Sequence, residues 1–125
     1  MRLFILTFAL SLMASPALAG TTIPDVFRGT WDSPANPTCD PQNSEAQVTI
    51  TKEGLYYSSS SDTVQNVKVK NRHEVVLDVI ENVIGSEGNS EGARRLALSD
   101  DEKFLIIEYL VGGSARHVLA RCPAK

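Results

Sequence analysis

The sequence predicts an all-β protein, a small antiparallel barrel of eight strands, with a β-sandwich as the alternative. Short runs of β-branched and aromatic residues recur between turn signals about 8–12 residues apart. Apolar and polar residues alternate within several of these runs, as at Val48 and Ile50. Beyond residue 19, no run has the spacing of an amphipathic helix. These observations together favour strands that bury one face.

The first 19 residues have the composition of a cleavable signal peptide. Met1-Arg2 is basic, residues 3–13 form an apolar run, and Ala17 and Ala19 supply the small residues of a cleavage site. The run is shorter than the roughly 20 residues of a membrane span. We therefore expect cleavage after Ala19 rather than a buried N-terminal helix. Removing 19 of the 125 residues leaves a single domain of 106 residues, 20–125.

Charge and hydropathy exclude some classes of partner. The chain has 12 basic and 15 acidic residues, a net charge of −3, which becomes −4 when Arg2 leaves with the signal peptide. An acidic chain with scattered basic residues does not favour binding to nucleic acid or anionic membranes. No later apolar run is long enough for a membrane span. We expect an extracytoplasmic protein, periplasmic in a Gram-negative cell and secreted otherwise.

Two cysteines, Cys39 and Cys122, remain after export. In an oxidising compartment they predict a disulfide, whereas free thiols for metal binding or catalysis would be the alternative. The bridge closes a loop of more than 80 residues, and its chain-entropy contribution is about 4–5 kcal/mol. Cys39 follows the first expected strand and Cys122 ends the last one. The bridge therefore favours a closed barrel, in which those strands are neighbours.

The alternation of apolar residues and the turn signals place the strands in order. The first, 27–31, precedes a long loop rich in proline and asparagine, 32–43, and a glycine-rich loop, 85–92, forms a hairpin tip. Gly54 supplies a positive φ in a hairpin turn at 52–54, and Val64 falls out of phase, which predicts a bulge. Ser58 to Asp62 is expected to be a polar loop. The remaining strands are expected at 46–51, 55–57, 64–69, 73–80, 94–98, 104–111 and 115–122.

Residues 104–111 are apolar on both faces apart from Glu108. One face could meet a partner or a ligand, but cover by the N-terminal segment is the simpler interpretation. Glu108 is expected to face solvent or to pair with Arg116 or Arg94, with a buried acid as the alternative. Arg94 and Arg95 fall on opposite faces of one strand, which predicts a solvated face and an internal pair, with a partner acid as the alternative.

The sequence contains no pattern that predicts catalysis, a cofactor or a metal. His73 and His117 lack ligand-type residues at a recognisable metal spacing. The serines at 58–61 stand beside Asp62, but no histidine pattern accompanies them. We therefore expect a protein that is not an enzyme, with no catalytic, cofactor or metal-binding residues.

Phe27-x-Gly29-x-Trp31 is the most informative motif. With this motif near the mature N-terminus, the chain resembles the calycin group of lipocalins, avidins and small bacterial metalloprotease inhibitors. The resemblance implies a barrel whose end is filled by Trp31, with Arg121 of the last strand lying across it. The protease inhibitors also match in length, signal peptide and a cysteine soon after the motif, but their second cysteine falls in mid-chain.

The function expected from this architecture is that of an exported binding protein without chemistry of its own. Its most concrete version is an inhibitor of a secreted enzyme such as a protease, whose cleft would receive Thr21, Thr22, Ile23 and Pro24 of the exposed segment 20–26. Deleting that segment should then leave the fold intact. The alternatives are a carrier of a small apolar ligand in the barrel and an envelope-associated structural or interaction protein.

Overall fold

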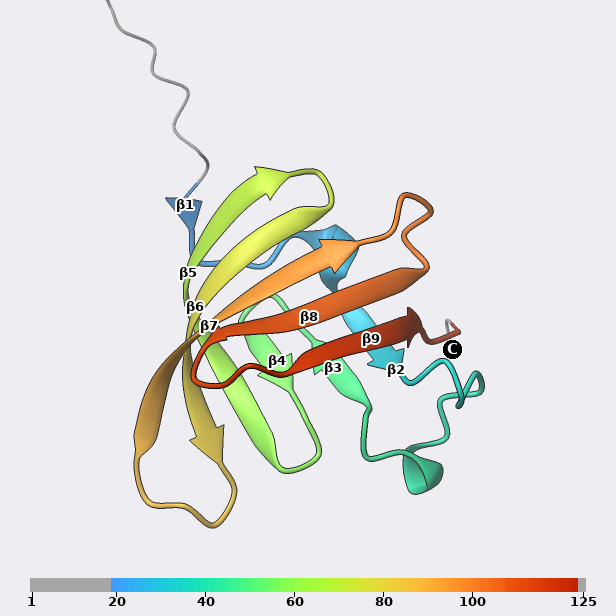
Figure 1. Ribbon diagram of the computed structural model, residues 1–125, viewed down its shortest axis with the longest axis horizontal. Helices are drawn as coiled ribbons and strands as arrows, with labels where there is room; N and C mark the ends of the chain where they lie inside the picture. The colour runs from blue at the N-terminus through green and yellow to red at the C-terminus, as the bar shows by residue number, and fades with distance from the viewer. Residues whose placement is uncertain (1–18, 124–125) are drawn as a thin grey trace, which may run out of the picture.

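The computed structural model describes residues 19–123 and shows a closed antiparallel β-barrel of eight strands (Figure 1). The expected fold class is confirmed, and the barrel rather than the sandwich is the correct alternative. Residues 1–18, which belong to the expected signal peptide, lie outside the described part of the chain. Within residues 19–123, no helix is both long and apolar enough to span a membrane.

Eight strands follow one another around the barrel, and a two-residue strand, β1 (Ala19–Gly20), pairs with β5 at Val67 and Lys68. Two 3₁₀ helices, η1 (Asp25–Phe27) and η2 (Pro41–Asn43), flank the first barrel strand. The barrel strands are β2 (Gly29–Asp32), β3 (Val48–Ile50), β4 (Gly54–Tyr56), β5 (Ser60–Asn71), β6 (Glu74–Val83), β7 (Asn89–Leu98), β8 (Phe104–Val111) and β9 (Arg116–Arg121).

The barrel closes where β2 pairs with β9 in antiparallel register, Trp31 opposite Arg121 and Asp32 opposite Ala120. The predicted disulfide is present beside this seam and joins Cys39 to Cys122. The backbone N–H of Cys122 also donates to the Thr30 carbonyl, 2.9 Å away. Closure therefore brings together two strands that are separated by almost the whole domain.

Inward side chains of all eight barrel strands form one apolar core. β6 and β7 alternate with a period of two, because every second residue, Val75, Leu77, Val79, Leu96 and Leu98, is buried. The other buried apolar residues are Ile23, Phe27, Trp31, Val48, Ile50, Leu55, Val64, Val67, Leu105, Ile107 and Leu119. These side chains occupy the lumen, as expected for a barrel of this strand number.

Several expected boundaries are wrong. Phe27 belongs to η1 rather than to the first strand, and β5 begins at Ser60, within the expected polar loop. The hairpin tip between β6 and β7 is shorter than 85–92, because β7 begins at Asn89. The bulge near Val64 is confirmed by a register shift between Val64 and Asn66. Polar residues can extend these strands because outward positions on a barrel face water, and the inward Asp62 pairs with Arg94 of β7.

Gly54 is needed for a reason other than the expected positive φ. The φ angle of Gly54 is not positive. A Cβ at this position would collide with the backbone carbonyl of Asp62 in β5. The glycine thus permits close approach of β4 and β5 at this point.

We predict that replacing both cysteines, Cys39→Ser with Cys122→Ser, lowers the free energy of unfolding by about 4–5 kcal/mol. The reason is that the bridge spans 83 residues and restricts the unfolded chain over that length. Urea denaturation of the wild type and the double variant measures the difference. Equal midpoints under non-reducing conditions would contradict the prediction.

Candidate functional site

One end of the barrel is closed by the motif that the sequence singled out. Trp31 is fully buried, and its Nε1 donates to the Phe27 carbonyl over 3.0 Å. Gly29 has a φ of 124°, a conformation that favours glycine, where the chain passes from η1 into β2. The motif therefore turns the chain and places two aromatic rings in the core.

Arg121 covers this closed end. Its Cζ atom lies 4.2 Å from the centre of the Trp31 ring, a cation–π contact. Its guanidinium donates to three backbone carbonyls, those of Val26, Arg28 and Glu102, at 2.8, 3.3 and 3.1 Å. Arg121 thus ties the N-terminal segment to the β7–β8 turn, in the position that the resemblance implied.

The N-terminal segment is only partly exposed. Thr21 and Thr22 are exposed and Pro24 is half-buried, but Ile23 is fully buried in the core. The backbone N–H of Ile23 donates to the Lys52 carbonyl, and its own carbonyl accepts from Arg28 Nε at 2.8 Å. The expectation that all of 20–26 is exposed is therefore wrong, and deletion of the segment would remove part of the core.

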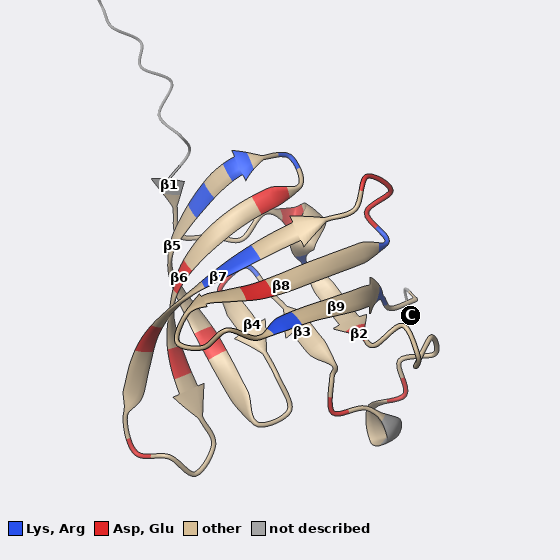
Figure 2. Ribbon diagram, viewed as in Figure 1, with Lys and Arg blue, Asp and Glu red and all other residues tan. Residues whose placement is uncertain are grey.

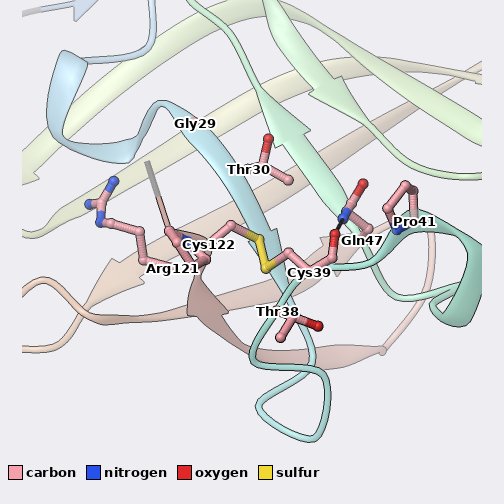
Figure 3. Close-up of a pocket in the computed structure, with 9 residues that line it drawn as sticks. Gly29, Thr30, Thr38, Cys39, Pro41, Gln47, Arg121 and Cys122 are labelled. Carbon is pink, nitrogen blue, oxygen red and sulfur yellow. Dashed lines mark hydrogen bonds between the residues drawn. A yellow bond between two sulfur atoms is a disulfide. The ribbon is translucent and has the colours of Figure 1, made fainter. Parts of the chain in front are cut away.

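A pocket of about 540 Å³ lies on the outer side of β2, beside the disulfide (Figure 3). We name it the disulfide pocket. It brings together four residues that the sequence singled out, Gly29, Cys39, Arg121 and Cys122, with residues that it did not. The latter are Thr30, Thr38, Pro41, Gln47 and Pro123. Among the described residues of this lining, Arg121 is the only charged one.

The wall of the disulfide pocket is held by Asp32, which is fully buried beneath the loop that follows β2. Its carboxylate accepts from the backbone N–H of Ser33, the side-chain amides of Asn36 and Gln47, and the hydroxyl of Ser44. Gln47 Nε2 also donates to the Cys39 carbonyl at 3.1 Å. These bonds fix the loop over the sheet, so the pocket is preformed.

A second polar cluster lies inside the barrel, toward the end opposite Arg121. Arg94 of β7 and Asp62 of β5 are 0 % and 1 % exposed, and Arg94 Nε lies 2.9 Å from Asp62 Oδ2. Arg94 Nη2 also contacts Glu81 of β6 at 2.6 Å. Its Nη1 donates to the carbonyls of Ala93 and Val111, so every nitrogen of the guanidinium has a partner.

The cluster extends to two tyrosines. The Tyr57 hydroxyl donates a hydrogen bond to Asp62 Oδ2 at 3.1 Å. Arg94 Cζ lies 3.7 Å from the centre of the Tyr109 ring, a cation–π contact. A Cβ at Gly92 would approach Arg94 Nη1 to 2.7 Å, so the glycine leaves room for the guanidinium. Burial lowers the pKa of Arg94, but the hydrogen bond and charge of Asp62 outweigh this and raise it. The guanidinium nitrogens of Arg94 and the carboxylate oxygens of Asp62 all have hydrogen-bond partners, so the cluster is a structural network that links β5 to β8.

We predict that Arg94→Met lowers the free energy of unfolding by about 3–5 kcal/mol, because it leaves Asp62 buried without its counterion. The matched control is Arg95→Met. Arg95 pairs with Glu74 at 3.0 Å on the outer face, partly exposed, so its loss should cost less than about 1 kcal/mol. Urea denaturation compares the two. Similar losses in both variants would contradict a dominant role for the buried pair.

Burial, together with the charge of Asp62, raises the pKa of Tyr57 far above its ordinary value of about 10. The folded state therefore holds this proton more tightly than the unfolded chain. The resulting stability is complete below about pH 10 and is lost as pH rises above it.

We accordingly predict that stability falls from about pH 8 to about pH 11, and that Tyr57→Phe makes this fall shallower. Tyr56→Phe, at an exposed position on β4, serves as the control and should leave the slope unchanged. Urea midpoints at the two pH values measure the slope. An unaltered slope in Tyr57→Phe would refute the assignment.

The other polar candidates lie apart from one another. His73 Nε2 contacts Glu102 Oε2 at 3.0 Å. The rings of His117 and Tyr109 form an edge-to-face contact with their centres 5.7 Å apart. Ser58 donates to the Glu45 carbonyl, and Ser60 and Ser61 begin β5. In the described residues, no group of three His, Cys, Asp or Glu side chains is arranged to hold a metal.

Glu108 is half-buried on the outer face of β8, in register between Arg95 and Arg116. Arg94 faces inward and pairs with Asp62 and Glu81 instead. The sequence predicted that Arg94 and Arg95 lie on opposite faces with one internal pair, and the structure shows that Arg94 is the internal one. The acids could not be assigned, because Asp62 lies 32 residues away and was expected in a loop.

Comparison with known proteins adds no relative. No protein-family model matches the chain, no curated protein matches it, and no solved structure matches it. The resemblance to the calycin group therefore remains a hypothesis based on the motif.

Proposed function

We propose that this protein is an exported binding protein without chemistry of its own, and that it captures a segment of a partner protein in the disulfide pocket. The observation that carries the proposal is the position of this pocket. Its volume of about 540 Å³ falls within the range of about 300–1,000 Å³ typical of binding sites. It lies on the outside of the barrel, where a protein segment has access.

The lining of the disulfide pocket suits a partly apolar segment. Pro41, Pro123 and the disulfide contribute apolar surface, and Thr30 and Thr38 contribute hydroxyl groups. Because the loop is held by Asp32 and by the bridge, little ordering cost would accompany binding.

The lumen supports the carrier alternative less well. Among residues 19–123, sixteen buried apolar side chains occupy the interior, together with the Arg94–Asp62 pair. A small apolar ligand would have to displace them, at the cost of a tightly packed core. Recognition on the outer surface requires no such rearrangement.

Export and inhibition are further parts of the proposal. The disulfide is consistent with an extracytoplasmic compartment, and residues 1–19 supply the expected signal. The partner that the resemblance implies is a secreted enzyme such as a protease. The disulfide pocket supports partner contact better than Thr21–Pro24, because Ile23 is held in the core.

We predict that Thr38→Trp, which fills the disulfide pocket from an exposed loop position, weakens partner binding at least tenfold. The matched control is Thr63→Trp, at an exposed position of β5 away from the pocket, which should bind like the wild type. Partners captured from the native extracytoplasmic fraction are purified, and their affinities for the three proteins are measured by calorimetry. An unchanged affinity for Thr38→Trp would refute the proposed site.

A further inference from the structure

The hairpin of β5 and β6 extends beyond β4, so the second half of β5 forms an edge of the sheet. β6 pairs with β5 along its length, whereas β4 pairs with β5 as far as Thr63. The backbone N–H of Val64 then donates to the Glu53 carbonyl at 2.9 Å. We name the residues that follow, 65–71, the β5 edge. A strand segment of this length spans about 23 Å, enough to pair with another extended chain.

β1 already lies along the β5 edge (Figure 1). In antiparallel register, Ala19 lies opposite Lys68 and Gly20 lies opposite Val67. The first buried residue after β1 is Ile23, so the chain before it is held by this short pairing alone. The edge therefore accepts an extended chain, and terminal pairing of this length opens at little cost in free energy.

The side chains of the β5 edge alternate between lysine and valine. Lys68 and Lys70 are exposed on the outer face, whereas Val67 is buried and Val69 is half-buried on the inner face. Figure 2 shows basic positions gathered near the end of β5 and in the turn that follows it. Within residues 19–123, neither lysine forms an ion pair.

The acids of the neighbouring strand β6 have other partners. Glu74 pairs with Arg95 at 3.0 Å, and Asp78 accepts a hydrogen bond from Asn66 Nδ2 at 3.4 Å. The residue of β6 that lies opposite Lys68 is a valine. The outer face of the β5 edge thus carries positive charge that the adjacent strand does not neutralise.

We propose that the β5 edge binds an extended acidic segment of a partner protein, which adds as a strand in place of β1. The backbone of the edge would supply the hydrogen bonds of the new strand pair, as in other cases of strand addition. The alternation of lysine and valine would select acidic residues on the outer face and apolar residues on the inner face, at every second position.

The same lysines argue against a second copy of this chain as the occupant. Two β5 edges paired antiparallel about Val69 would place Lys68 of each copy directly opposite Lys70 of the other. Like charges in directly opposed positions destabilise a strand pair, and lysines on edge strands protect against such self-pairing. An acidic strand converts this repulsion into attraction.

The expected cleavage after Ala19 would favour exchange of β1 for the partner strand. Cleavage removes one of the two residues of β1 and creates an α-ammonium group on Gly20, one register position from Lys68. This group is largely protonated at neutral pH, so it adds to the positive charge at the edge. The mature chain should therefore hold β1 less firmly and attract acidic residues more strongly.

NMR titration of the isotope-labelled protein, purified as its host exports it, tests the proposal. The probe is a peptide of about seven residues in which glutamate alternates with valine, and the control peptide carries lysine in place of glutamate. The glutamate peptide should shift the amide signals of residues 65–71 with a dissociation constant on the order of 0.1–1 mM, and the lysine peptide should bind about tenfold more weakly or less. Equal binding of the two peptides, no binding up to about 5 mM, or shifts confined to the disulfide pocket would overturn the proposal.

Charge reversal tests the role of the two lysines. Lys68→Glu combined with Lys70→Glu should invert the preference, so that the lysine peptide binds about tenfold better than the glutamate peptide. The matched control, Lys103→Glu with Arg116→Glu, changes the net charge equally at exposed positions of the β7–β8 turn and β9 and should keep the preference for glutamate. The amide spectrum verifies that each variant is folded. Equal effects of the two double variants would assign the preference to overall charge and overturn the site.

Deletion of residues 20–22 tests the displacement of β1. The deletion leaves Ile23 in the core and removes the competing strand, so the glutamate peptide should bind about threefold more tightly. An unchanged or weaker affinity would overturn the exchange. None of the altered positions lines the disulfide pocket, so strand addition at the β5 edge and partner capture in the pocket can fail independently.

Discussion

The pairing of the first barrel strand with the last is the constraint on which the rest of the structure depends. β2 contributes only four residues, and β9 only six, yet their contact converts an open meander into a barrel without free edges between them. The disulfide stands beside this seam, and Arg121 lies across Trp31 at its end. Hydrogen bonds, a covalent bridge and a cation–π contact thus act on one junction.

The two ends of the barrel are closed by different physical means. Aromatic packing under Arg121 fills one end, where the guanidinium stays exposed and binds backbone carbonyls. Toward the other end, Arg94 is fully buried and needs the carboxylates of Asp62 and Glu81 to offset its desolvation. This polar network specifies strand register, because a shift of one residue would turn Arg94 outward and leave Asp62 unpaired.

The interior of the barrel is filled by side chains, so the candidate binding surface lies outside it. The disulfide pocket is on the outward side of β2. The outer faces of β8 and β9 leave Phe104 and Val118 exposed, so the expectation that the N-terminal segment covers this strand is wrong. That segment packs at the closed end instead, where the backbone N–H of Ile23 donates to the Lys52 carbonyl.

The sequence by itself determined the fold class, the disulfide and the bulge near Val64, because these depend on local period and on cysteine number. It also singled out Trp31 and Arg121. Only the tertiary structure decided that Ile23 is buried, that Asp62 is the partner of Arg94, and that Phe104 and Val118 stay uncovered. Those outcomes depend on which distant segments meet when the barrel closes, and the alternation of residues along one strand carries no information about its distant neighbours.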